Sequence, residues 1–126
     1  GNGVFFSISL KIGIVLNLIA VLTNLGICFI SNEYKWYEQV EKISTQCRWI
    51  GLIYIILAWF MGDGTILSSG RDTYAQVAHW MSIFSVGWII VFTVSLFSKI
   101  WSKGDKMTNK ALGAALLYFV VAFLIH

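Results

Sequence analysis

Ionisable side chains are sparse in this chain, and a few of them border apolar runs where they could do chemistry. Asp63, Arg71, Asp72 and His79 follow one another at such a boundary. Acidic and imidazole groups beside a membrane segment could relay protons, so Asp63 and His79 define a possible polar path. The same residues also fit solvated loop charges, with Asp72 capping the next helix through its carboxylate. We favour this second interpretation.

Two amides lie inside the first apolar run and could hydrogen-bond to a neighbouring helix. Asn17 and Asn24 alternate with Gly13 and Ala20 at spacings of four, three and four, which places all of them on one helix face. In lipid, small and amide side chains allow helices to approach closely and to bond to each other. We predict a packing seam here, and a polar path lined by the two Asn is the alternative. The full predicted seam comprises Gly13, Asn17, Ala20, Asn24, Ser82, Ala111 and Ala115.

Motifs of catalysis and cofactor binding are absent from the sequence. There is no phosphate-binding glycine loop, dinucleotide turn, HExxH pair or nucleophile elbow. A lone histidine at a helix end, His79, is poor evidence for heme. Cys28 and Cys47 show no metal-binding spacing and are expected to be reduced thiols. The sequence therefore predicts a non-enzymatic protein without metal, cofactor or evident small-molecule substrate, although bound phospholipid is compatible with it.

The composition indicates that lipid is the solvent. Hydrophobic residues make up 58% of the chain and charged residues 12%, whereas a soluble domain is about half apolar and about a quarter charged. The net charge of +3 could attract nucleic acid, but lysines on the cytoplasmic side of a membrane protein give the same value. We predict one all-α membrane domain, residues 1–126, with no nucleic-acid motif.

Four hydrophobic helices in two hairpins are predicted, at about 4–30, 49–61, 77–97 and 111–125. Crossing a bilayer takes about 20 apolar residues, so the second and fourth runs are short. Gly62-Asp63-Gly64 predicts a turn that ends the second helix at Met61, and continuation to Leu67 is the alternative. The polar stretch 31–48 predicts a short amphipathic helix on the membrane surface. Residues 62–76 are expected to form the outer loop.

The positive charges predict an orientation. The 31–48 stretch has three Lys or Arg and the 98–110 loop has four, against one in 62–76. The basic side should face the cytoplasm, which leaves both termini outside, in a bacterial inner membrane. Gly1 in place of an initiating Met is compatible with a removed leader or an expression remnant. The basic loop, expected to contact lipid headgroups, contains Lys99, Lys103, Lys106 and Lys110.

The C-terminal half resembles the F-type conjugative pilins of type IV secretion systems. The resemblance covers residues 68–126. It rests on the polar Ser69–Asp72 segment, the apolar run Val77–Phe97, the four-lysine loop and the apolar run Ala111–His126. It implies a leader-cleaved subunit whose basic loop is cytoplasmic before assembly and faces the filament lumen afterwards. It also implies an extracellular filament that retains phospholipid between subunits.

Three functions fit these observations, and a membrane anchor for a redox complex is a fourth alternative. The first is a structural subunit that self-associates or joins other membrane subunits, and its specific form is a pilin-like component of a conjugation or secretion apparatus. The second is a small transporter or channel that uses Asn17, Asn24 and Asp63. The third is a membrane immunity or exclusion protein, which would need no catalytic residues. The short second and fourth runs and the small residues favour the first.

Overall fold

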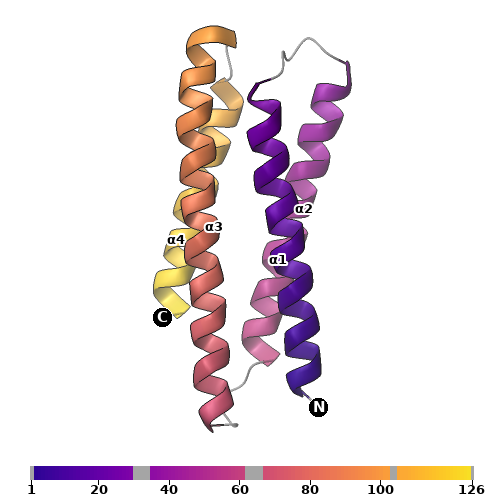
Figure 1. The fold of residues 1–126 in the computed structure, drawn as a ribbon, viewed down its shortest axis with the longest axis vertical. Helices are drawn as coiled ribbons and strands as arrows, with labels where there is room; N and C mark the ends of the chain where they lie inside the picture. The colour runs from indigo at the N-terminus through magenta and orange to yellow at the C-terminus, as the bar shows by residue number, and fades with distance from the viewer. Residues whose placement is uncertain (1, 30–34, 62–66, 103–104, 126) are drawn as a thin grey trace.

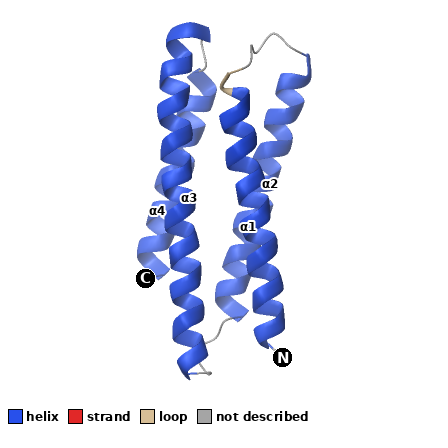
Figure 2. Ribbon diagram, viewed as in Figure 1, coloured by secondary structure: helices blue, strands red, loops and turns tan. Residues whose placement is uncertain are grey.

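The computed structural model describes residues 2–29, 35–61, 67–102 and 105–125. They form four α-helices: α1 (Asn2–Ile27), α2 (Lys35–Met61), α3 (Leu67–Ser102) and α4 (Asp105–Ile125). No strand occurs in these ranges (Figure 2). Three helices are long and apolar enough to cross a membrane, over Val4–Ile27, Lys35–Phe60 and Ala75–Phe97, and α4 has a shorter apolar stretch, Asn109–Leu124. The all-α membrane fold predicted from the sequence is confirmed.

The helices form two antiparallel hairpins that lie side by side. In Figure 1, α1 pairs with α2 and α3 pairs with α4 along most of their lengths. The hairpins meet mainly where α1 contacts α3, and α2 also touches α3. Both the interior and the outer surface are apolar: Trp88 and Phe84 are buried, whereas Leu22 and Phe123 are 64% and 75% exposed. Such helices suit a bundle that is surrounded by lipid.

The polar stretch before residue 49 is not a separate surface helix. Residues 35–48 form the first half of α2, which continues unbroken to Met61 and therefore has 27 residues. Ser44 and Arg48 turn toward the interior, where both are buried, whereas Glu38, Lys42 and Gln46 are exposed. The end of α2 at Met61 agrees with the prediction, and the predicted turn at 62–64 lies outside the described residues.

Three further boundaries differ from the prediction. The first helix ends at Ile27 rather than at residue 30. The outer loop is shorter than 62–76, because α3 begins at Leu67 and Asp72 lies inside it rather than at its cap. No proline interrupts this segment, so its Gly and Ser residues can remain helical. The basic loop also shrinks: Lys99 belongs to α3, Lys106 and Lys110 belong to α4, and Lys103 lies outside the described residues.

Candidate functional site

Two glycines bring α1 and α2 into close contact. A Cβ atom on Gly13 would lie 2.5 Å from Ile55 Cγ1 and 2.9 Å from the Gly51 carbonyl oxygen. A Cβ atom on Gly51 would lie 2.6 Å from Asn17 Nδ2. Only glycine permits this approach, since any larger side chain would meet backbone atoms. The face of α1 on which the sequence predicted a seam is thus used inside the monomer, against α2.

The two asparagines of α1 are fully buried and bonded. Asn17 Nδ2 donates to the Gly13 carbonyl at 2.7 Å, and Asn24 Nδ2 donates to the Ala20 carbonyl at 2.8 Å. Asn24 Nδ2 also bonds to Ser44 Oγ of α2, which donates to the Ala20 carbonyl at 3.0 Å. Helix-to-helix bonds of this kind hold membrane bundles together. Asn24 Oδ1 remains a buried acceptor for which the structure gives no partner.

A buried arginine lies at the middle of α2. Arg48 is the fourteenth of 27 residues in the helix, about 20 Å from either end, and is 8% exposed. Its guanidinium carbon is 5.1 Å from the centre of the Trp49 ring and 5.5 Å from that of the Trp88 ring of α3. Both distances fit cation–π contacts. The cation is thus flanked by aromatic rings.

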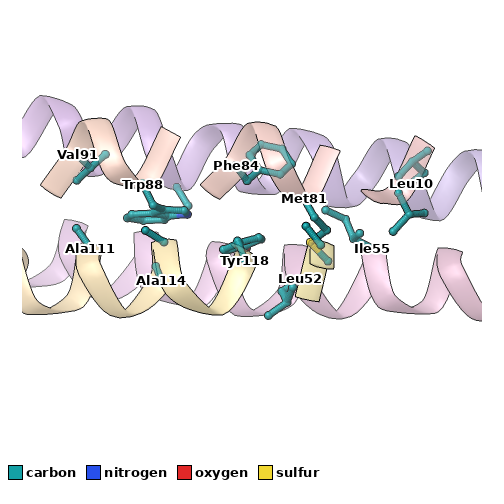
Figure 3. Packing of buried hydrophobic residues seen from close by; sticks show 14 of the residues in the cluster. Leu10, Leu52, Ile55, Met81, Phe84, Trp88, Val91, Ala111, Ala114 and Tyr118 are labelled. Carbon is teal, nitrogen blue, oxygen red and sulfur yellow. The ribbon is translucent and has the colours of Figure 1, made fainter. Parts of the chain in front are cut away.

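The α3–α4 hairpin contributes polar groups at the same depth. The Tyr118 hydroxyl donates to Asn17 Oδ1 and so joins α4 to α1 across the bundle. Ser85 Oγ donates to the Ala115 carbonyl at 3.0 Å and ties α3 to α4. Figure 3 shows Trp88 between these helices, close to Ala114, with Phe84 and Tyr118 next along the interior. The Phe84 and Tyr118 ring centres are 6.1 Å apart. Trp88 is fully buried, and its Nε1 is a donor for which the structure gives no partner.

An ion pair lies further along α2, toward Lys35. Lys110 Nζ of α4 is 3.7 Å from Glu41 Oε1 and also donates to Thr45 Oγ1. The Lys110 and Glu41 side chains are 19% and 23% exposed. Lys110 was predicted to belong to a basic loop that contacts lipid headgroups. That placement is wrong, because its side chain turns inward to α2.

These residues together form what we call the polar core, which extends from the middle of the bundle toward the Lys35 end of α2. Asn17, Ser85 and Tyr118 are close to the midpoints of their apolar helical stretches, as Arg48 is of α2. All four helices therefore supply polar groups at one depth. The polar core consists of Asn17, Asn24, Glu41, Ser44, Thr45, Arg48, Ser85, Lys110 and Tyr118.

The remaining predicted site residues lie apart from the polar core. Ser82 was predicted to pack, but it is exposed and its hydroxyl donates to the Ala78 carbonyl of its own helix at 2.9 Å. His79, predicted for a polar path, is also exposed, and its ring lies edge-on to that of the adjacent Trp80. The other half of that path, Asp63, lies outside the described residues. Ala111 and Ala115 are buried between helices. No disulfide joins Cys28 to Cys47.

Sequence reasoning missed Arg48, the most unusual residue of the site. It was counted as the end of a surface stretch because the fully apolar run begins at Trp49. A signal was present, since the apolar run of thirteen residues is too short to span the bilayer. Buried positions in α2 recur at Ser44, Arg48, Gly51 or Leu52, and Ile55. This spacing of three and four places the polar residues on the same face as the apolar core.

No family model, curated protein or solved structure matches this chain. Within the described ranges, no group of three or more His, Cys, Asp or Glu side chains could hold a metal ion. The polar core itself offers one buried guanidinium, one ammonium–carboxylate pair, two amides and several hydroxyls. These groups can bind a polar or charged solute.

Proposed function

We propose that this protein is a small, non-enzymatic transporter or channel that passes a solute through the polar core. The observation that carries the proposal is Arg48, a cation that is 8% exposed at the middle of a spanning helix. A charge at the centre of a bilayer is costly, and ionisable residues that face the interior of a membrane bundle mark ion and substrate pathways.

Packing alone does not account for this arginine. The Gly13–Gly51 contact and the Asn24–Ser44 bond already join α1 to α2. Replacing a buried ionic group by apolar residues of similar volume is often neutral or stabilising. A bundle that served only as a structural element would therefore gain little from a cation at this depth. A solute pathway, in contrast, needs a polar group there.

Solute flux in proteoliposomes tests the proposal. We expect osmotic swelling or ionic current with the wild-type protein and the loss of most of it in Arg48→Gln. The matched control is Lys11→Gln, because Lys11 is a cation on the exposed surface of α1, and this variant should keep wild-type flux. Absence of flux under every gradient, or equal flux in Arg48→Gln and wild type, would overturn the proposal.

The proposed location is a bacterial inner membrane, with both termini outside the cytoplasm. With Arg48 and Lys110 left out because they turn inward, the 31–48 and 98–110 segments still hold five Lys or Arg, against one in 62–76. This excess supports a cytoplasmic position for that end of the bundle. A tag fused to the C-terminus should be digested by protease added to intact spheroplasts. A protected tag would contradict the orientation.

A second candidate function is that of a subunit in a larger membrane assembly, of which a pilin-like subunit is the specific form. It is favoured by Gly113 on α4, which is exposed and has no atom within 4 Å of its Cβ position. A partner helix could approach closely there. In a variant without native cysteines, Gly113→Cys should crosslink between copies, whereas the neighbouring Ala114→Cys should not, since Ala114 is buried. A monomer that does not crosslink at either position would exclude self-assembly through α4.

A further inference from the structure

We infer that the polar core binds a small monovalent anion at Arg48, with the Trp88 indole N–H as a second donor; this inference rests on the proposed function and names its solute. The first observation is an imbalance of charge. Arg48 and Lys110 are cations, and Glu41 is paired with Lys110 at 3.7 Å. In the part of the chain that the structure describes, no carboxylate lies within ion-pair distance of the Arg48 guanidinium.

The second observation concerns donors. Trp88 Nε1 is buried without an acceptor, and the Arg48 guanidinium carbon is 5.5 Å from the centre of the same indole. Arginine has five N–H donors and no acceptor, and the indole nitrogen only donates. Buried donors are normally bonded. A species that only accepts hydrogen bonds and carries negative charge would bond to the Trp88 N–H and neutralise the Arg48 guanidinium.

The charge of the site sets the charge of the ligand. Two cations and one carboxylate leave one positive charge in the polar core, which a monovalent anion would neutralise. A metal cation would be repelled by Arg48, and a neutral solute would leave the buried charge uncompensated. A divalent anion such as sulfate would leave the polar core with one net negative charge in place of one positive charge. It would also cost more to dehydrate.

The surroundings set the size and source of the ligand. The Trp88 ring lies against Arg48, and Phe84 and Tyr118 are fully buried next to Trp88 along the interior, so the anion must be small. A lipid phosphate is an unsuitable source, because headgroups lie about 15 Å from the middle of the hydrocarbon layer. The chemistry fits a halide, nitrate or a one- or two-carbon carboxylate, the last of which pairs well with a guanidinium.

Chloride binding to the purified protein in detergent tests the inference without requiring transport. We expect excess broadening of the chlorine NMR line that saturates with chloride and is displaced by nitrate or formate, but not by sulfate at equal ionic strength. Arg48→Gln should bind about tenfold or more weakly. Trp88→Phe, which keeps an aromatic ring and removes the donor, should bind roughly three- to tenfold more weakly. Lys11→Gln should match the wild type.

The outcomes separate this inference from the proposed function. Flux without saturable chloride broadening would overturn anion binding and leave a pathway for another solute. Saturable broadening without flux would support the anion site and overturn the transporter. Unchanged broadening in both Arg48→Gln and Trp88→Phe would also overturn the inference. If Arg48→Gln elutes as an aggregate in size exclusion, Trp88→Phe decides the outcome, because it keeps Arg48 and an aromatic side chain in the core while it removes the indole N–H.

Discussion

The Tyr118 hydroxyl makes one hydrogen bond, which a phenylalanine would remove without changing the shape of the core. It donates to Asn17 Oδ1, and the two residues are 101 positions apart in the chain. Tyr118→Phe would leave this amide oxygen buried without its donor. We expect a loss of about 1 kcal/mol in unfolding free energy, the usual size for a hydrogen bond between membrane helices. Denaturation in mixed micelles measures it.

The control for this prediction is Tyr54→Phe. Tyr54 is half-buried on α2, and the structure gives its hydroxyl no hydrogen-bond partner. This variant should therefore unfold with wild-type free energy. Equal stability of Tyr118→Phe and wild type would show that the bond between α4 and α1 contributes nothing to the bundle.

Cys28 should be a slow nucleophile. It follows α1 directly and is 6% exposed, and burial raises its pKa to about 11 because the thiolate is poorly solvated. At pH 8 only about one thiol in a thousand would be ionised. In a Cys47→Ser variant, the labelling rate with iodoacetamide should therefore rise about tenfold per pH unit from pH 8 to pH 10. A rate that levels off below pH 10 would contradict the pKa shift.

At the residue scale, the sequence predicted which helix face a residue occupies better than it predicted what surrounds the side chain. Asn17 and Asn24 could be assigned to one helix face because spacing fixes the angular position on a helix. The environment of Lys110 could not be predicted, because its inward direction depends on Glu41 and Thr45, which lie on a helix distant in sequence. The unbonded nitrogen of Trp88 could not be predicted either, because it depends on how the neighbouring helices pack around the ring.

At the element scale, the α1–α2 contact depends on the absence of a side chain at residue 51. Gly51→Ala would place a Cβ atom 2.6 Å from Asn17 Nδ2 and 3.1 Å from the Asn17 backbone nitrogen. The helices must then separate, and we expect a destabilisation of roughly 1–3 kcal/mol, as for other overpacked cores. Unfolding in mixed micelles, with circular dichroism as the signal, measures this change.

Gly113→Ala is the matched control, since the same substitution on α4 meets no atom within 4 Å. Alanine favours helix over glycine by up to about 1 kcal/mol, so this variant should be neutral or more stable. If Gly51→Ala were as stable as Gly113→Ala, the close approach of α1 and α2 would be unimportant for the fold.

The elements themselves were predictable in kind but not in length. Apolar composition located all four helices, and the glycine pair around Asp63 located the end of α2 at Met61. The start of α2 at Lys35 was missed because polar residues were taken to exclude a spanning helix. They do not exclude it here, because the partner helices supply bonds and aromatic contacts for Ser44 and Arg48. Because these contacts come from other helices, they cannot be inferred from the sequence of α2 alone.

At the scale of the whole molecule, the two hairpins enclose the polar core, together with buried apolar side chains, within an apolar exterior. Each hairpin alone would leave part of this interior facing lipid: Arg48 of the first contacts Trp88 of the second, and Asn17 of the first bonds to Tyr118 of the second. An uncovered cation in hydrocarbon is costly. The association of the hairpins is therefore coupled to the burial of the site, and the fold and the proposed function depend on the same contacts.

The reversal potential of the reconstituted protein tests this account most directly. In a potassium chloride gradient across a planar bilayer, we expect wild-type current to reverse near the chloride equilibrium potential. Arg48→Gln should lose most of that current, whereas Lys11→Gln should retain both the current and its selectivity. A reversal near the potassium equilibrium potential, or an Arg48→Gln current equal to wild type, would contradict the central role given to the buried arginine.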